Sequence, residues 1–185
     1  MEQRLQTLLA DRFQLKIHEE TREIPVLAIV LAKPGKFGPN FRPHPADAQC
    51  NTTLLPQGRT NALTAPSPKD MVDGGYPVFC GGLIQLEASA PGRLHYGGRD
   101  LTMEFLSNNL SSMSQLGRPI VDKTGLTGNI DFHLEWTPEG RAASSENPGP
   151  TFEAAVREQL GLKLESTKAP LPVLVVDKIE HLTGN

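Results

Sequence analysis

Three polar residues at alternate positions carry the side chains best suited to chemistry. Asp131, His133 and Glu135 lie in the segment NIDFHLEW, where apolar residues alternate with them. Alternate residues of a β-strand share a face, about 7 Å apart. An imidazole and two carboxylates on one face could bind zinc or manganese, or transfer a proton. The alternative interpretation is an amphipathic edge strand whose polar face is exposed to water.

Two other groups of polar residues have the same two interpretations. Asp122 in VDKTG, with Thr124 and Thr127 nearby, offers oxygen ligands to a hard cation such as calcium, although the segment does not match an EF-hand loop. An Asx turn stabilised by Asp122 explains the same residues. His18, beside two glutamates, is typical of a charged strand end. Trp136 is expected to anchor the core.

The two cysteines, Cys50 and Cys80, lie in the loop-rich middle of the chain. We expect a disulfide between them, because it would hold a loop of about 30 residues and contribute roughly 3–4 kcal/mol. Such a bond persists in an oxidising compartment. Two unpaired thiols are the alternative. A zinc site at the cysteines is not indicated, because neither has a partner at CxxC spacing.

The common catalytic and cofactor motifs are absent from the sequence. Without GxSxG there is no nucleophile elbow, and without GxxxxGK[ST] there is no phosphate-binding P-loop. The chain also lacks a GxGxxG dinucleotide fingerprint and the HExxH of zinc proteases. We therefore predict no cofactor. We expect a bound divalent cation, calcium or zinc, only if the chain is a metal-dependent hydrolase.

Charge and hydropathy exclude two classes of partner. The 18 basic and 21 acidic residues give a formal charge of −3, whereas nucleic-acid and anionic-membrane binders need a concentrated positive surface. No apolar run approaches the roughly 18 residues of a membrane helix. The first residues carry charges throughout and lack the apolar core of a signal peptide. We expect neither nucleic-acid binding nor membrane insertion of this chain.

Hydrophobic periodicity and turn residues predict the secondary structure. A long irregular loop covers residues 34–82, and a shorter unstructured one covers 137–150. Asp100 is the expected N-cap of the second helix, Thr151 that of the third, and Gly161 ends the third. Helices are predicted at 2–13, 101–113 and 151–160, and strands at 14–19, 24–32, 92–98, 120–121, 129–136, 162–165 and 172–179.

An internal repeat suggests the architecture. The first and last segments align without a gap at an offset of 147 residues, so that Pro25 meets Pro172. We predict α-β-β units at 1–33, 100–136 and 151–180, because one such unit cannot bury its own apolar faces but packed copies can. The expected fold is α+β, with a mixed or antiparallel sheet and helices packed on one face, as a single compact unit spanning 1–185. A single irregular α+β domain with accidental similarity is the alternative.

Three stretches carry a resemblance to a known family: LLADRFQLKIHEETREIPVLAIVLAK, LGRPIVDKTGLTGNIDFHLEWTP and FEAAVREQLGLKLESTKAPLPVLVVDKIEHLTGN. The chain resembles uncharacterised proteins expanded in soil Acidobacteria of the Solibacter type and catalogued as a domain of unknown function. The resemblance implies an exported, periplasmic protein of which this chain is about the C-terminal two-thirds. The α-β-β unit is also similar, more weakly, to short N-terminal modules of secretins and TonB-dependent receptors.

Two functions follow from these observations. The first is a non-catalytic binding or interaction module of the bacterial cell envelope, with a protein or small-molecule ligand. The second is a small, metal-dependent hydrolase of an ester or lactone, supported by the face of Asp131, His133 and Glu135 and by a long loop that could form a pocket wall.

Overall fold

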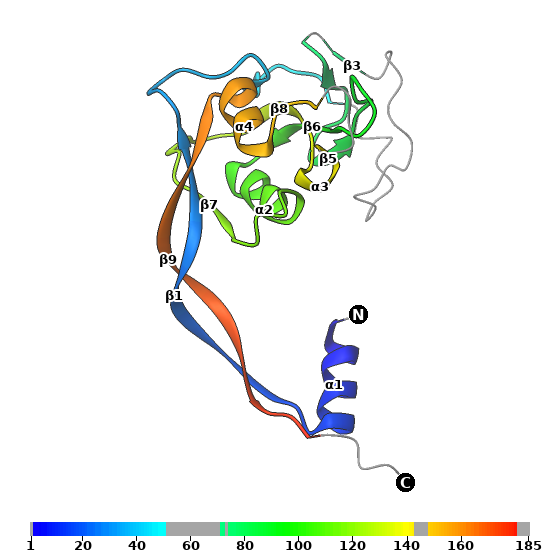
Figure 1. Cartoon of the computed structure of the whole chain (residues 1–185), viewed down its shortest axis with the longest axis vertical. Coiled ribbons are helices and arrows are strands. Elements are labelled where there is room, and N and C mark those ends of the chain that lie inside the picture. The colour runs from blue at the N-terminus through cyan, green and yellow to red at the C-terminus, as the bar shows by residue number, and fades with distance from the viewer. Residues whose placement is uncertain (1, 51–70, 73, 143–147, 181–185) are drawn as a thin grey trace. The chain divides into compact units, whose positions relative to one another are not determined.

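The computed structural model describes residues 2–50, 71–72, 74–142 and 148–180 and has an α+β fold, which confirms the predicted class (Figure 1). No helix in these ranges is long and apolar enough to cross a membrane. The helices are α1 (Glu2–Phe13), α2 (Met103–Met113), α3 (Glu139–Ala142) and α4 (Phe152–Leu160). The strands are β1 (Lys16–Leu31), β2 (Phe41–Pro43), β3 (Met71–Val72), β4 (Tyr76–Pro77), β5 (Gly82–Gln85), β6 (Leu94–Leu101), β7 (Ile120–Asp122), β8 (Ile130–Trp136) and β9 (Leu162–Lys178).

The chain divides into two compact units. The ribbon unit comprises residues 1–25 and 167–185, and the core unit comprises residues 26–166. The strands β1 and β9 contribute residues to both units. That residues 1–185 form one unit built from repeats stays a prediction.

Each of the long strands β1 and β9 replaces two predicted strands. The segments expected at 14–19 and 24–32 merge into β1, and those expected at 162–165 and 172–179 merge into β9. The predicted turns at 20–23 and 166–171 contain no glycine or asparagine to favour them, and β1 and β9 pair with each other instead. The two ends of the chain therefore have the order helix–strand, not α-β-β.

The middle segment has the predicted order of helix, strand, strand, but its strands join different sheets. β7 pairs in parallel with β1, with Leu27 opposite Ile120, in a sheet of order β7-β1-β9. β8 lies in an antiparallel sheet of order β2-β8-β6-β5. β8 is thus flanked by strands on both sides and is not the edge strand that the sequence suggested.

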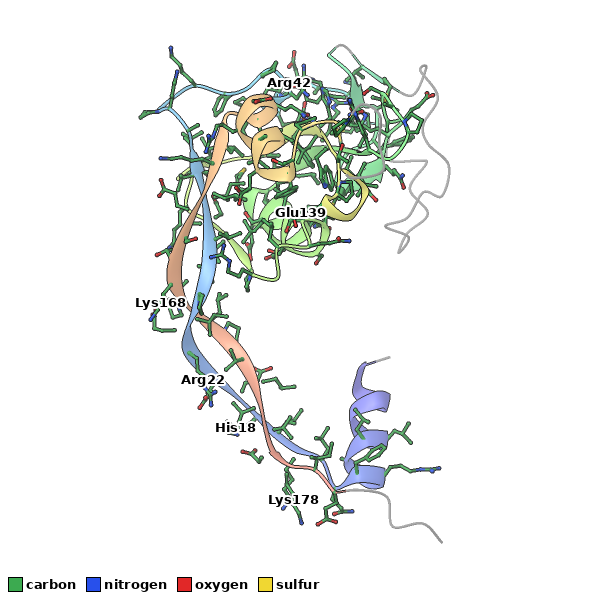
Figure 2. The ribbon with its side chains drawn as sticks, viewed as in Figure 1. His18, Arg22, Arg42, Glu139, Lys168 and Lys178 are labelled. Atoms are coloured by element: carbon green, nitrogen blue, oxygen red, sulfur yellow. A yellow bond between two sulfur atoms is a disulfide. The ribbon has the colours of Figure 1, made fainter. Side chains whose placement is uncertain are left out.

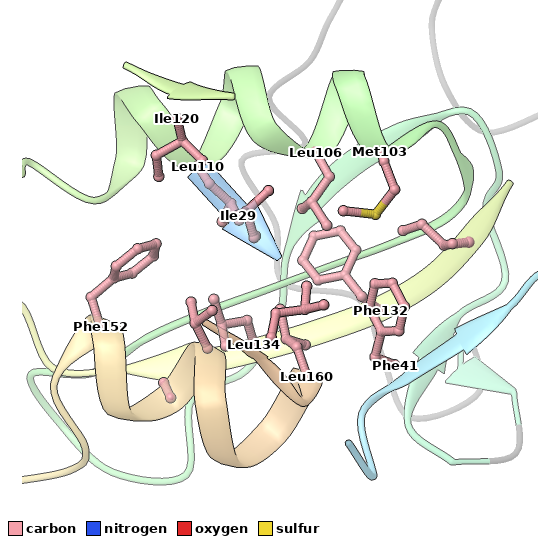
Figure 3. Packing of buried hydrophobic residues seen from close by; sticks show 14 of the residues in the cluster. Ile29, Phe41, Met103, Leu106, Leu110, Ile120, Phe132, Leu134, Phe152 and Leu160 are labelled. Atoms are coloured by element: carbon pink, nitrogen blue, oxygen red, sulfur yellow. The ribbon is translucent and has the colours of Figure 1, made fainter. Parts of the chain in front are cut away.

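The hydrophobic core of the core unit lies between helices α2 and α4 and one face of β8 (Figure 3). Alternation along β8 places Ile130, Phe132, Leu134 and Trp136 on this face, each at most 2% exposed. Trp136 anchors the core as predicted, with its ring against Phe152 of α4. The opposite face of β8 carries Asp131, His133 and Glu135.

The helix ends follow local capping rules. Thr151 caps α4 by accepting a hydrogen bond from the Ala154 N–H, and Gly161 ends that helix in a left-handed conformation with φ of 70°, both as predicted. The N-cap of α2 is Thr102, not Asp100. β6 extends through Leu101, so the helix starts later than its apolar pattern suggested.

The two predicted loops contain short regular elements. β2, β3 and β4 lie within residues 34–82, of which 51–70 and 73 are outside the described residues. The shorter loop, 137–150, contains the single turn of α3, which corrects its assignment as unstructured; residues 143–147 are outside the described residues.

The segment after β1 binds the C-terminal end of α4. The Gly38 N–H donates to the Leu160 carbonyl at 2.9 Å, and the Asn40 N–H donates to the Gln159 carbonyl at 2.9 Å. These bonds satisfy helix carbonyls that have no partner within the helix. The backbones approach so closely that a Cβ added at Gly38 would lie 2.6 Å from the Gly161 nitrogen.

Candidate functional site

Three polar side chains on the second face of β8 form the candidate site, as the alternating pattern predicted. Segments of the long loop and of β6 cover this face, so that Asp131 is fully buried and Glu135 is 15% exposed. The alternative prediction of a solvent-exposed polar face is therefore wrong for Asp131. Each of the three side chains has its own set of partners.

Asp131 lies at the centre of a cluster of arginine and histidine side chains. Its carboxylate accepts hydrogen bonds from Arg42 Nε at 3.0 Å and from the Asp100 N–H at 3.2 Å. His44 Nδ1 lies 2.6 Å from Asp131 Oδ1, and Arg99 Nε lies 3.6 Å from Oδ2. A buried carboxylate needs such partners, because its desolvation would otherwise oppose folding.

The long loop and β6 each supply one of the arginines around Asp131. Arg42 lies on the short strand β2, and Figure 2 labels it in the core unit. Its guanidinium also stacks 4.1 Å from the centre of the Tyr76 ring. Burial raises the pKa of Tyr76, Arg42 lowers it and Asp131 raises it, with a net upward shift. Tyr76 is therefore a neutral phenol near neutral pH.

His133 forms a pair with a second imidazole. His95 Nε2 lies 3.2 Å from His133 Nδ1, and His133 Nε2 lies 3.1 Å from the Gly74 carbonyl. Tyr76 packs edge-on against the His133 ring. Burial, together with the repulsion of a charged His95, lowers the pKa of His133 to about 4. His133 is neutral at neutral pH.

Glu135 is held by one serine and one arginine. Its carboxylate accepts bonds from Ser89 Oγ at 2.5 Å, from the Ser89 N–H at 2.6 Å and from Arg93 at 3.0 Å. Burial would raise the pKa of Glu135, but these hydrogen bonds and the charge of His95 outweigh it and lower the pKa. Glu135 is an anchored carboxylate that fixes the segment after β5.

A side chain of α4 satisfies both backbone hydrogen-bonding groups of Glu135 in β8. Gln159 of α4 accepts from the Glu135 N–H at 2.9 Å and donates to the Glu135 carbonyl at 2.6 Å. β2 pairs with β8 only at residues 130–132, and at Glu135 these two bonds take the place of bonds to a neighbouring strand. Helix α4 therefore fixes the position of the candidate site through the strand backbone.

The predicted disulfide between Cys50 and Cys80 is present, close to the Asp131 cluster. His44 Nε2 lies 3.9 Å from Cys50 Sγ. Among the described residues, the one group of three or more His, Cys, Asp or Glu side chains with ligand atoms all within 4.8 Å of one another is His44, Cys50 and Cys80. Asp131, His133 and Glu135 share a face but do not form such a group.

The remaining polar candidates have local structural roles. Asp122 accepts from the Thr124 N–H at 2.8 Å and from its hydroxyl at 2.7 Å, which is the Asx turn that the sequence suggested. In the ribbon unit, where Figure 2 labels His18, the Nδ1 of this residue lies 2.9 Å from the Asp177 carboxylate. His18 thus belongs to a cross-strand pair.

A pocket of about 590 Å³ lies elsewhere in the core unit, at the C-terminal end of α4. Phe37 and Pro39 contribute apolar surface to it, and the charged lining residues are Lys33, Lys36, Arg157, Glu158 and Lys163. It contains none of the site residues predicted from the sequence.

Sequence reasoning found the β8 residues but missed most of their partners. Arg42 and His44 come from the long loop, His95 and Arg99 from β6, and none has a regular spacing to β8. Only the paired register of β6 and β8, which places His95 opposite Glu135 and Gly97 opposite His133, brings these residues together.

Comparison with known proteins identifies the family. No curated protein and no solved structure matches the chain. A family model described as a protein of unknown function, DUF3738, matches residues 1–179, which confirms the resemblance to a family of unknown function. The chain therefore belongs to the DUF3738 family.

Proposed function

We propose that this chain is a non-catalytic protein-interaction module and that it binds a partner by adding a strand to the open edge of β9 in the ribbon unit. β9 is the last strand in the order β7-β1-β9, so one of its edges has no strand partner among the described residues. Unpaired strand edges bind extended segments of other polypeptides.

Exposed apolar side chains in the ribbon unit carry this proposal. Among the described residues, five large apolar side chains are exposed, and four of them belong to the ribbon unit. Leu174 is 60% exposed and Val176 54%, both on β9. Ile179 follows that strand at 66%, and Leu8 of α1 is 51% exposed. Apolar surface concentrated on a small two-stranded unit favours a partner that covers it.

The prolines of β9 indicate which edge is open. Proline has no N–H, so Pro170 and Pro172 fit a position whose backbone points away from β1. Backbone groups alternate between the two edges of a regular strand, so we expect Leu174 and Val176 to point their N–H and carbonyl groups to that same edge. On this expectation, the exposed side chains and the free backbone groups belong to the same residues.

The partner that fits this edge is an extended segment with apolar residues at alternate positions. Its backbone would pair with Leu174 and Val176, and its side chains would cover theirs. Fully burying a leucine or valine contributes about 1.5–3 kcal/mol. Since each side chain is already partly covered, we expect roughly 2 kcal/mol from the two together, or about 30-fold in affinity.

The cell envelope is the proposed setting. The disulfide between Cys50 and Cys80 supports an oxidising compartment, since such bonds are rare where glutathione keeps thiols reduced.

The site geometry favours binding over hydrolysis. Asp131 and Glu135 are each held by cationic or hydroxyl side chains, and His133 is paired with His95. A hydrolase needs a base and a nucleophile that face one shared position, whereas these groups point to separate partners.

The test uses random peptides displayed on phage, selected against the disulfide-bonded chain. Enriched peptides are synthesised, and their affinity is measured by fluorescence anisotropy for the wild type and for a double variant, Leu174→Lys with Val176→Lys. Phe37→Lys is the matched control, because Phe37 is an exposed apolar residue of the core unit, 37% exposed. Fluorescence of the buried Trp136 reports whether the core unit of each variant is folded.

We expect enriched peptides with alternating apolar residues, bound about 30-fold more weakly by the double variant and unchanged by Phe37→Lys. Self-association of the wild type that the double variant abolishes would also support strand addition and would identify a second copy as the partner. Failure to enrich any peptide, or equal binding by the double variant, contradicts the proposal.

A further inference from the structure

The disulfide lies beside an imidazole whose orientation is fixed by a buried carboxylate. His44 Nδ1 is 2.6 Å from Asp131 Oδ1, and its Nε2 is 3.9 Å from Cys50 Sγ. One ring nitrogen of His44 and the sulfur atoms of Cys50 and Cys80 all lie within 4.8 Å of one another. The chain thus gathers two sulfur atoms and one ring nitrogen at a single position of the core unit.

The contact with Asp131 determines which nitrogen of His44 can act as a ligand. Asp131 also accepts bonds from Arg42 and from the Asp100 N–H, so its carboxylate is an acceptor and Nδ1 donates to it. In the neutral ring, Nε2 then carries the lone pair and faces the sulfur atoms. Histidine ligands of zinc are oriented in this way by a carboxylate on the opposite nitrogen.

The distances suit a tetrahedral metal ion once the sulfur–sulfur bond is broken. Zinc binds thiolates at about 2.3 Å and imidazole nitrogen at about 2.0–2.1 Å, which places nitrogen and sulfur roughly 3.6 Å apart. The observed separation of His44 Nε2 from Cys50 Sγ is 3.9 Å. The two sulfur atoms would have to separate to roughly 3.8 Å, a movement within reach of side-chain rotation.

Arg99 holds both cysteine segments independently of the disulfide. This buried side chain contacts the carbonyls of Gln49, Pro77 and Val78, each at 3.4 Å, next to Cys50 and Cys80 in the sequence. Its own carbonyl accepts from the Gly81 N–H at 2.9 Å. Both segments therefore keep an attachment to β6 after reduction.

The charged groups around the cysteines carry both signs. Arg42 and Arg99 lie 3.0 and 3.6 Å from the Asp131 carboxylate, and Asp100 Oδ1 lies 4.0 Å from His44 Nε2. Arg99 Nε is buried and makes no hydrogen bond among the described residues. Thiolate is the form of cysteine that binds metal, and a nearby arginine favours it.

We propose that the reduced chain binds one zinc ion through Cys50 Sγ, Cys80 Sγ and His44 Nε2, and that the disulfide is the metal-free state of the same site. A dithiol reductant gives its two electrons and two protons to the disulfide, producing two thiols and becoming a cyclic disulfide itself. Zinc then displaces the two thiol protons, while the Nδ1 proton of His44 stays on its bond to Asp131. Water completes the tetrahedron. The proposal does not depend on the ribbon unit.

The test compares the oxidised chain with the chain reduced by a phosphine and freed of metal. Zinc affinity is measured by competition with a chromophoric chelator, and cobalt is used as a spectroscopic substitute whose absorption reports thiolate ligation. The variants are Cys50→Ser, His44→Ala and Asp131→Asn. His133→Ala is the matched control, because it removes the neighbouring His95–His133 pair, which is the rival imidazole site.

We expect one zinc per reduced chain, thiolate-to-cobalt absorption and no comparable binding by the oxidised chain. Affinity should fall at least 100-fold in Cys50→Ser and His44→Ala, about 10–100-fold in Asp131→Asn, and stay unchanged in His133→Ala. Trp136 fluorescence shows whether each protein is folded. The proposal is overturned if the reduced wild type binds no more tightly than Cys50→Ser, if His133→Ala removes the binding, or if reduction unfolds the chain and zinc does not refold it.

Discussion

The buried imidazole of His133 should make the stability of the protein depend on pH. Its pKa is about 4 in the folded chain and 6.5 in an unfolded one. As pH falls below 6.5, the unfolded chain takes up a proton that the folded chain does not, so stability is lost until pH reaches about 4. Between pH 7 and pH 5 this linkage amounts to about 2 kcal/mol.

The assay is urea unfolding with the disulfide intact, followed by Trp136 fluorescence at pH 7 and at pH 5. His133→Asn should lose about 2 kcal/mol less than the wild type between these pH values. His95→Asn should give an intermediate loss, since His95 repels a charged His133. Thr151→Ala is a control that destabilises the chain without removing a titrating group. Equal losses for the wild type and His133→Asn would refute the reasoning.

Three further substitutions test how the site is positioned, each by urea unfolding at neutral pH. Gly38→Ala should destabilise the chain by about 1–3 kcal/mol, because the added Cβ would lie 2.5 Å from the Gln159 carbonyl carbon. Gly140→Ala is the control: no atom lies within 4 Å of its added Cβ, so its stability should change by less than about 0.5 kcal/mol. Equal effects of these two would contradict the close approach. Thr151→Ala removes an N-cap and should cost about 1 kcal/mol, and no loss would argue against the cap. Gln159→Ala leaves the Glu135 N–H and carbonyl without their partners and should cost about 1–3 kcal/mol; a neutral result would mean that water replaces both bonds.

Local patterns predicted the elements whose ends depend on neighbouring residues. Thr151 and Gly161 marked both ends of α4, because capping is decided within one turn of the helix. The alternation along β8 separated Trp136 and the other core residues from Asp131, because side chains of a strand alternate between two faces.

The features that the sequence did not predict depend on pairing between strands that are distant in the sequence. β1 and β9 continue through their polar segments because each gives the other a partner, and no local signal records a partner as distant as Asp177 is from His18, 159 positions along the chain. The partners of Asp131 and His133 come from β2 and β6, and their positions follow from sheet register and from the path of the long loop. The contact of His44 with Cys50 could not be predicted from the sequence, because it also depends on the path of the long loop.

The most direct test of strand addition is amide hydrogen exchange at single residues of β9, measured by nuclear magnetic resonance with and without a saturating selected peptide. If the outer edge is open, the amides of Leu174 and Val176 exchange rapidly in the free chain, those of Val173 and Val175 exchange more slowly, and the peptide protects the first pair. Protection of Leu174 and Val176 in the free chain, or continued rapid exchange in the complex, would contradict the proposed interaction surface.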